Sequence, residues 1–143
     1  MNREERAAVV KEALSWQPTP YHHMGRVKGA GTDCGMFILQ VFENCGLIPH
    51  VDVLFYPQDW AWHRCEEKYL TWIKKYAHEV SREPWPGDIV VHQFGRCVSH
   101  GGIVIQWPQI IHAYIGVGVV LADGSKGELA DRQRGVFSYW GDD

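Results

Sequence analysis

Cys34 is the residue whose surroundings most suggest chemistry. It follows a glycine-containing stretch and the pair Thr32-Asp33, and it opens an apolar run with helical spacing. The first turn of a helix offers unpaired backbone N–H groups and a partial positive charge, which favour a reactive thiolate and can hold a developing oxyanion. A small hydrophobic residue at the start of a buried stripe would give the same pattern. Spacing alone therefore leaves a nucleophile and a structural cysteine as alternatives.

Two histidines could supply the base that a cysteine nucleophile needs, together with the group that orients this base. His100 and His112 lie in neighbouring predicted strands, and two glycines follow His100 directly. If the loop between the strands has an odd number of residues, the two side chains lie on one face as diagonal neighbours. The glycines would leave room for a ligand or another backbone. Taken singly, each histidine could instead be a partly buried strand residue that bonds to the backbone.

Tyr21 precedes Cys34 by thirteen residues in the same glycine-containing stretch. Its hydroxyl could donate to the oxyanion or to the cysteine, although its ring could equally cover the core.

A zinc site is the competing chemistry. His63 and Cys65 could combine with His50 or with the pair His22-His23. Residues two apart on a helix point in different directions, however, and this spacing matches no standard ligand set. None of the four cysteines forms a C-x-x-C pair. We therefore predict no metal and no cofactor, and free thiols in a reducing compartment.

The first half of the chain carries helical patterns. Asn2 is a candidate N-cap of a first helix, which Pro18 and Pro20 end. The glycine-containing residues 19–33 predict a loop, a second helix starts near Asp33, and a third covers residues 59–80. The apolar stripe of the first helix is Ala7, Val10, Ala13 and Leu14; that of the second is Cys34, Phe37, Ile38, Val41, Phe42 and Cys45, with Gly46 as the C-terminal stop.

The second half carries short β-rich runs. Strands are predicted over residues 89–94, 99–107, 109–115, 117–121 and 136–140. Their connections are too short for crossovers, so the sheet is predicted to be antiparallel. Helices followed by strands indicate an α+β fold, with N-terminal helices packed on a C-terminal sheet.

Composition limits the remaining function classes. The chain has 143 residues, of which 45% are hydrophobic and 22% charged, so we expect a single globular domain over residues 1–143. The net charge of −3 makes nucleic acid an unexpected partner. No apolar run approaches the ~20 residues that span a bilayer. Charges near the N-terminus precede any long apolar run, so no secretory signal is predicted and synthesis in the cytoplasm is expected.

Five stretches, in order, resemble the NlpC-type cell-wall peptidases, a papain-like family of cysteine endopeptidases. The resemblance covers residues 19 to about 115, and residues 27–34 look like the phage-type branch found in tail gene clusters and gene-transfer particles. The stretches are Thr19-Pro20-Tyr21, Gly31-Thr32-Asp33-Cys34-Gly35, Pro86-Gly87-Asp88-Ile89-Val90, Ser99-His100-Gly101-Gly102-Ile103 and Ile111-His112-Ala113.

The resemblance implies a role for each candidate residue. Cys34 would be the nucleophile, His100 the general base, His112 the orienting third residue, and Tyr21 a neighbour of Cys34 on the oxyanion side. The implied fold is papain-like, with helices on an antiparallel sheet. The implied substrate is a peptidoglycan stem peptide, often cut after a γ-linked D-glutamyl residue, and no cofactor is implied. A protein of a phage or prophage tail would be carried to the cell wall and would have tail proteins as partners.

The sequence also departs from the family pattern. Gly35 and Met36 follow the cysteine where the family usually has serine and glycine, and residues 22–25 replace an aromatic residue followed by two glycines. These changes bear on substrate specificity more than on reaction type. Two alternatives remain open: a non-catalytic phage tail assembly protein, and a related Cys-His amidase or acyltransferase.

Overall fold

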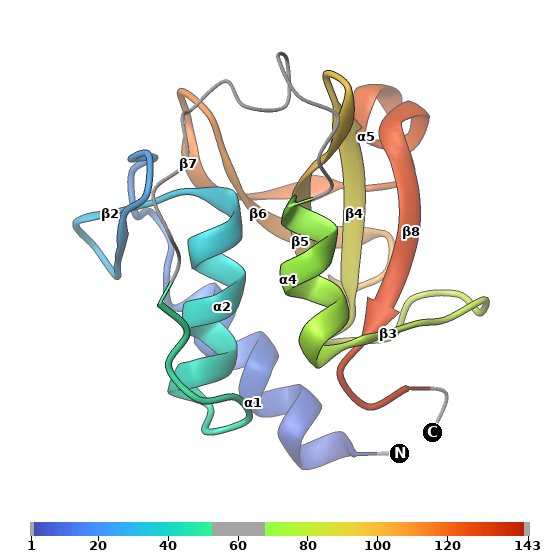
Figure 1. The fold of residues 1–143 in the computed structure, drawn as a ribbon, viewed down its shortest axis with the longest axis horizontal. Coiled ribbons are helices and arrows are strands. Elements are labelled where there is room, and N and C mark those ends of the chain that lie inside the picture. Colours follow the sequence, from blue (N-terminus) through green and yellow to red (C-terminus); the bar gives the residue numbers. More distant parts are fainter. Residues whose placement is uncertain (1, 53–67, 142–143) are drawn as a thin grey trace.

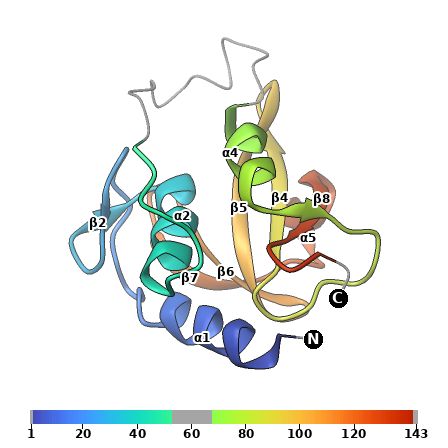
Figure 2. The same ribbon diagram turned by 60° about the horizontal axis from the view of Figure 1, so that its bottom comes forward.

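The structure, a computed structural model, describes residues 2–52 and 68–141, with side chains from residue 70 in the second range. The longer helices lie against one face of a twisted sheet, and α2 (Cys34–Asn44) and α4 (Lys68–Tyr76) run side by side over it (Figures 1 and 2). The two main layers confirm the predicted α+β class. Within the described residues, no helix is both long and apolar enough to cross a bilayer.

The six-stranded sheet is antiparallel throughout, as predicted. Its order is β3-β8-β4-β5-β6-β7, so the two strands with the candidate histidines, β5 and β6, are neighbours. Most predicted strands lie within one or two residues of the observed bounds, but β8 begins three residues earlier than expected. The strands are β3 (His78–Glu79), β4 (Ile89–Phe94), β5 (Cys97–Gln106), β6 (Gln109–Tyr114), β7 (Gly118–Asp123) and β8 (Gln133–Ser138).

Helix α1 (Arg3–Leu14) turns a different face inward from the predicted one. Ala7 and Leu14, expected in the core, are exposed. Arg6 is only 3% exposed and lies on the buried face with Val9 and Ala13. A buried arginine needs a partner of opposite charge, and the apolar spacing of the helix does not reveal one.

That partner is Asp88, at the start of β4. Its carboxylate accepts hydrogen bonds from Nη1 of Arg6 at 2.8 Å and Nη1 of Arg82 at 2.7 Å. Arg6 also donates to Oγ of Ser138 at 3.3 Å and lies over the ring of Trp140, 4.3 Å from its centroid. This cluster joins α1 to the beginning of β4 and the end of β8.

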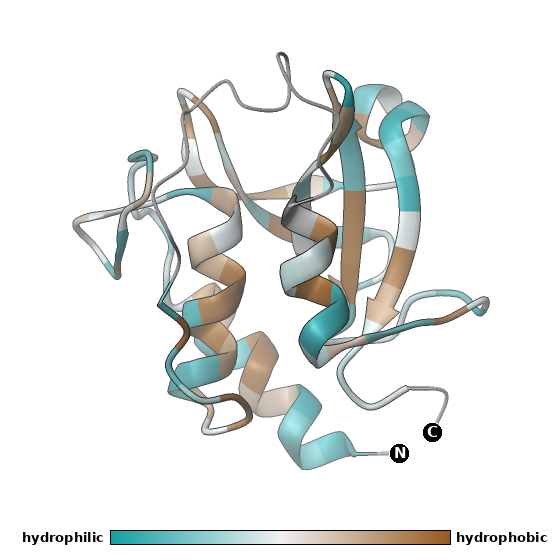
Figure 3. Ribbon diagram, viewed as in Figure 1, coloured by the Kyte–Doolittle hydropathy of each residue, from teal (hydrophilic) through white to brown (hydrophobic). Residues whose placement is uncertain are grey.

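Helix α2 (Cys34–Asn44) confirms the predicted second helix. The side chain of Asp33 caps it by accepting the N–H of Met36 at 2.9 Å. Gly46, at φ +73°, follows its last turn in a conformation that favours glycine. Figure 3 shows apolar residues along this helix and on the strands behind it, and α2 forms the centre of the main core.

Helix α4 (Lys68–Tyr76) is the described part of the predicted third helix. Residues 59–67 lie outside the described residues. The helix ends earlier than predicted, because His78 and Glu79 form β3 and pair with Ser138 and Phe137 of β8.

Three further short elements were not expected. Residues 19–33, predicted as a loop, contain the antiparallel pair β1 (Arg26–Val27) and β2 (Gly31–Thr32). Helix α5 (Gly127–Arg132) precedes β8 and buries none of its residues fully. Leu129 of α5 packs against a small second core of alternate strand residues. That core consists of Val80, Val90, Val104, Ile110 and Val136.

Candidate active site

The first residue of α2 meets the strand that carries His100. Cys34 is half-buried, whereas His100 and His112 are 7% and 3% exposed. Sγ of Cys34 donates a hydrogen bond to the carbonyl oxygen of Ser99 at 3.4 Å. Ser99 directly precedes His100 in the chain. The predicted nucleophile and the predicted base therefore belong to one site. No hydrogen bond joins their side chains in the structure.

A β-bulge makes this contact possible. His92 of β4 lies opposite His100, but the next pair joins Gln93 to Val98, so Ser99 is an extra residue in β5 with no residue paired to it in the register of β4. A bulged residue leaves the regular ladder of hydrogen bonds, and bulges often redirect side chains near functional sites. Here the carbonyl of Ser99 is available to the thiol of Cys34.

The two predicted histidines are hydrogen-bonded to each other. Nε2 of His100 and Nδ1 of His112 are 2.8 Å apart, and the ring centroids are 5.0 Å apart. The strand register pairs Ile103 with Ile111, which makes the histidines diagonal neighbours on one face, as expected.

The two histidines share a face for a different reason from the one expected, which was a loop with an odd number of residues. The turn, Trp107-Pro108, has two residues, an even number. A register shift between Val104 and Gln106 adds one residue to β5 and restores the odd spacing between Ile103 and Ile111. Without that bulge, His100 and His112 would point to opposite faces of the sheet.

Gly102 allows β6 to approach closely enough for the histidine pair. A Cβ atom at this position would lie 3.0 Å from the carbonyl oxygen of Ile111 and 3.2 Å from Cβ of His112. Both distances are tight, so a side chain at position 102 would push the strands apart. The glycine therefore clears space for another backbone, one of the two uses considered from the sequence.

Burial and a nearby carboxylate determine the protonation state of Cys34. Burial raises the pKa of the thiol, and the negative charge of Asp33 raises it further. The backbone N–H groups of Gly35, Cys34 and Gly101 act in the opposite direction. The expected acidified thiol is therefore not what the resting structure favours, because burial disfavours the charged sulfur and the capping carboxylate of Asp33 adds to this effect.

The histidines are held neutral. Burial lowers the pKa of His100 well below its ordinary value of 6.5, and possible positive charges on His112 and His92 lower it further. Burial lowers the pKa of His112 to about 4. The resting site is thus a neutral thiol beside a neutral imidazole pair, and each neutral ring has one nitrogen without a hydrogen.

Tyr21 is linked to the segment that leads into α2. It forms a β-bridge with Thr32, two residues before Cys34. Burial raises the pKa of its hydroxyl, and the negative charges that Cys34 and Asp33 can carry raise it further. The hydroxyl therefore remains a neutral donor close to the sulfur.

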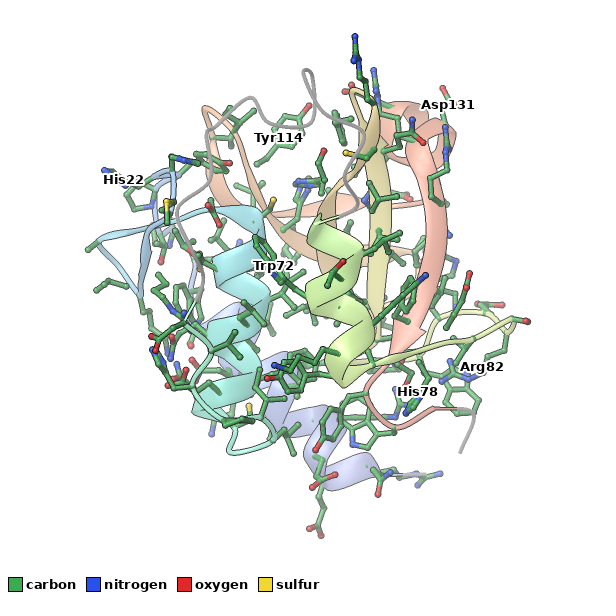
Figure 4. All side chains as sticks on the ribbon, in the orientation of Figure 1. His22, Trp72, His78, Arg82, Tyr114 and Asp131 are labelled. Carbon is green, nitrogen blue, oxygen red and sulfur yellow. The ribbon has the colours of Figure 1, made fainter. Side chains whose placement is uncertain are left out.

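Three other rings surround His100, and sequence reasoning did not assign them to the site. The ring centroids of Phe94, His92 and Tyr114 lie 5.4, 5.7 and 5.9 Å from that of His100. Tyr114 lies at the end of the molecule where α2 begins (Figure 4). A signal for it existed, because a residue two positions after His112 shares its face of the strand.

The competing zinc site can be examined only in part. His63 and Cys65 lie outside the described residues. His22 bonds to the carbonyl of His23, and His50 bonds to Glu43 and Asp52. Within residues 2–52 and 68–141, no group of three or more His, Cys, Asp or Glu residues is arranged to hold a metal ion.

Comparison with solved structures places this fold among known ones. The chain is similar to a lipoprotein-like NLP/P60 family protein from Staphylococcus aureus, with 21% identity and a TM-score of 0.68 over 97% of this chain and 42% of that one. An NlpC/P60 family protein from Bacillus cereus is 16% identical, with a TM-score of 0.70 over 94% of this chain and 40% of that one. The NlpC/p60 domain of the peptidoglycan hydrolase SagA is 21% identical, with a TM-score of 0.60 over 93% of this chain and 97% of that one. The chain spans about two fifths of the first two proteins.

Sequence comparison assigns the family. No curated protein sequence matches the chain. The model of the NlpC/P60 family matches residues 18–137, a range that contains Tyr21, Cys34, His100 and His112. The match covers most of the chain and coincides with the fold shared with the solved structures, and on this evidence the chain belongs to the NlpC/P60 family.

Proposed function

We propose that the protein is a cysteine endopeptidase that hydrolyses amide bonds in peptidoglycan stem peptides. The observation that carries the proposal is the 2.8 Å bond between His100 and His112, next to a thiol held against the backbone of Ser99. Membership of the NlpC/P60 family supports cysteine peptidase chemistry.

The bond between the two histidines supports a separate role for each ring nitrogen. Nε2 of His100 is engaged by Nδ1 of His112, which leaves Nδ1 of His100 for the thiol. For this nitrogen to accept a proton, Nε2 must carry the hydrogen and donate it to His112. His112 then fixes the tautomer of the base, the role that an acidic residue has in other triads.

The reaction proceeds in two halves. The Cys34 proton moves to Nδ1 of His100 as the sulfur attacks the amide carbonyl carbon. The backbone N–H of Cys34 and the hydroxyl of Tyr21 stabilise the oxyanion. Collapse breaks the C–N bond, and His100 gives its proton to the leaving amine. Water then attacks the thioester as His100 accepts a proton, and this proton returns to the sulfur of Cys34 as the acid product leaves.

The bond that is cleaved and the route to the cell wall are proposed from the resemblance seen in the sequence. We propose cleavage after γ-linked D-glutamyl residues, by a protein made in the cytoplasm and carried to the cell wall in a phage or prophage tail. The stretch from residue 27 to residue 34, which looks like the phage-type branch, supports the tail assignment.

One observation favours a second candidate, a non-catalytic tail assembly protein. The thiol of Cys34 bonds to a backbone carbonyl, and burial together with Asp33 raises its pKa. A protein that kept the fold without turnover would tolerate this arrangement. In apo enzymes, however, catalytic hydrogen bonds are often long and tighten only when substrate binds.

Digestion of defined muropeptides tests these proposals. Purified protein should release the fragment that ends in γ-D-glutamate, as identified by mass spectrometry, and Cys34→Ser should release none while melting at the same temperature. Equal turnover by wild type and Cys34→Ser would remove Cys34 from the mechanism. No turnover by the folded wild type would favour the assembly protein. Transfer of the acyl group to an added amine would indicate an acyltransferase.

A further inference from the structure

Two of the rings around His100 are held in place from α5. The hydroxyl of Tyr114 donates to Oε2 of Glu128 at 3.2 Å. The guanidinium of Arg132 lies over the ring of Phe94, with Cζ 4.6 Å from the centroid. Both rings meet His100 edge to face, at interplanar angles of 85° and 74°.

Glu128 and Arg132 also hold each other. Nε of Arg132 is 2.9 Å from Oε1 of Glu128, one helical turn away. Arg132 further donates to the backbone carbonyl of Gln93, next to Phe94. The two side chains thus form one connected unit that touches both ring walls of the base.

The ion pair between Glu128 and Arg132 adds little to the stability of the fold. The side chains of Glu128 and Arg132 are 51% and 39% exposed. An exposed ion pair at i,i+4 on a helix contributes little to the free energy of unfolding, because water screens both charges. The contacts that distinguish this pair are those to Tyr114 and Phe94, and through them to His100.

The orientation of His100 depends on such neighbours. The regular pairing of β5 with β6 begins only at Ile103, and the bulge at Ser99 interrupts the pairing with β4 on the other side. His100 has one ring hydrogen bond, to His112. Packing by the surrounding rings must supply the remaining restraint on its side-chain torsions.

We propose that Glu128 and Arg132 are positioning residues that hold Tyr114 and Phe94 as walls around His100. The walls keep Nε2 of His100 on His112 and leave Nδ1 for Cys34. This inference rests on the proposed function of His100 as the base, but the restraint on the ring can be measured without a substrate.

The first measurement is kinetic, on a muropeptide that the wild type cleaves. Arg132→Gln and Glu128→Ala should lower kcat roughly tenfold and leave KM unchanged, because a misplaced base slows chemistry without weakening binding. Glu128→Gln keeps an acceptor for the Tyr114 hydroxyl and should retain most of the activity. Arg134→Gln is the matched control: Arg134 bonds to the side chain of Gln93 and to backbone carbonyls of residues 131 and 133, and it lies over none of the aromatic rings in the described part of the chain.

The second measurement is NMR of the ring nitrogens in the same variants. The wild type and Arg134→Gln should each give one set of signals for His100 and His112, with the shared hydrogen in place. Arg132→Gln and Glu128→Ala should show exchange between ring orientations. Unchanged signals and unchanged kcat in both variants would refute the proposal.

The two measurements separate failure of this inference from failure of the proposed function. If the folded wild type cleaves no muropeptide, the proposed function fails, and the NMR spectra still decide whether α5 restrains His100. If the wild type is active and the variants match Arg134→Gln, only the positioning role fails.

Discussion

His100 and His112 form a pair of neutral imidazoles to which the proposed mechanism gives unequal tasks. In that mechanism His100 exchanges a proton with Cys34, while His112 bonds to the far nitrogen of His100. Loss of a general base typically lowers the reaction rate 10²–10⁴-fold. Loss of the orienting group should cost less, because the base still reaches a productive orientation part of the time.

We therefore expect His100→Ala to abolish measurable cleavage of a muropeptide. His112→Ala should retain reduced but detectable turnover, and His112→Asn should retain more because its amide restores a hydrogen bond to His100. The measurement is kcat/KM for the three variants, with thermal melts to check folding. If His112→Ala proved inactive and His100→Ala active, the roles would have to be exchanged.

His92 is an unusual buried residue in this site. It is fully buried, and neither ring nitrogen has a hydrogen-bond partner. Burial lowers its pKa to about 4, with a further contribution from His112. An unpaired buried polar group costs about 1–3 kcal/mol.

We expect His92→Phe to raise the free energy of unfolding near pH 7, because it removes two unpaired nitrogens at similar volume. The variant should also flatten the acid side of the stability curve. His92 and His112 bind protons in the unfolded state from pH 6.5 downward but resist protonation when folded until about pH 4. Stability is thus complete above pH 6.5 and declines as the pH falls toward 4, by on the order of 3 kcal/mol for each residue. Urea unfolding at pH 7 and pH 5 measures both effects, and equal pH dependence in wild type and variant would contradict the assignment.

At the scale of elements, the start of α2 combines two opposing influences on Cys34. The helix N-terminus directs N–H groups toward the sulfur, which lowers the thiol pKa, but burial raises this pKa more, and the capping carboxylate of Asp33 raises it further. Asp33 also accepts the N–H of Met24 at 2.8 Å, so it ties the preceding loop to the helix. The cap therefore stabilises the helix at the cost of thiol acidity.

Asp33→Asn should make Cys34 more reactive. Asparagine is a comparable N-cap but removes the negative charge, so the thiol pKa falls and alkylation by iodoacetamide at pH 7 becomes faster. Loss of the bond from Met24 should cost about 1 kcal/mol of stability. Alkylation of Cys34 followed by peptide mass spectrometry across pH 6–10 provides the measurement, with Cys45 as the internal control. An unchanged rate would mean that burial alone controls the thiol.

At the scale of the whole molecule, the Arg6–Asp88 pair joins α1 to a segment 82 residues later in the chain. Asp88 is fully buried between two arginines, and Arg6 reaches Ser138 as well. Removing one member of a buried ion pair leaves a charge without its partner and typically costs 3–5 kcal/mol. The remaining Arg82 reduces that cost here but cannot replace the link to α1.

Arg6→Ala should accordingly lower the free energy of unfolding by about 2–4 kcal/mol. Arg3→Ala, an exposed arginine on the same helix, should change it by less than about 0.5 kcal/mol. Urea unfolding monitored by tryptophan fluorescence compares the two variants. Equal stabilities would mean that α1 is held by its apolar contacts alone.

Much of this molecule is determined locally and is therefore visible in the sequence. The apolar spacing, the capping Asp33 and the terminal Gly46 specify α2 through contacts a few residues apart. Short turns and period-two runs specify the antiparallel strands, and they bring His100 and His112 to neighbouring positions. Family motifs in the expected order pointed to the site residues that the structure gathers, and their catalytic roles stay predictions.

Other features depend on partners that are distant in the chain, and only the tertiary structure reveals them. Arg6 is buried because Asp88, 82 residues away, neutralises it. The rings around His100 come from two other strands, and Tyr114 and Phe94 among them contact α5, a helix whose sequence carries no buried apolar stripe. Two bulges decide where His100 points, and burial reverses the expected acidity of Cys34. The spacing of apolar residues predicts which face of a helix or strand is buried. Charge pairing, desolvation and strand register depend instead on the residues that lie across the core.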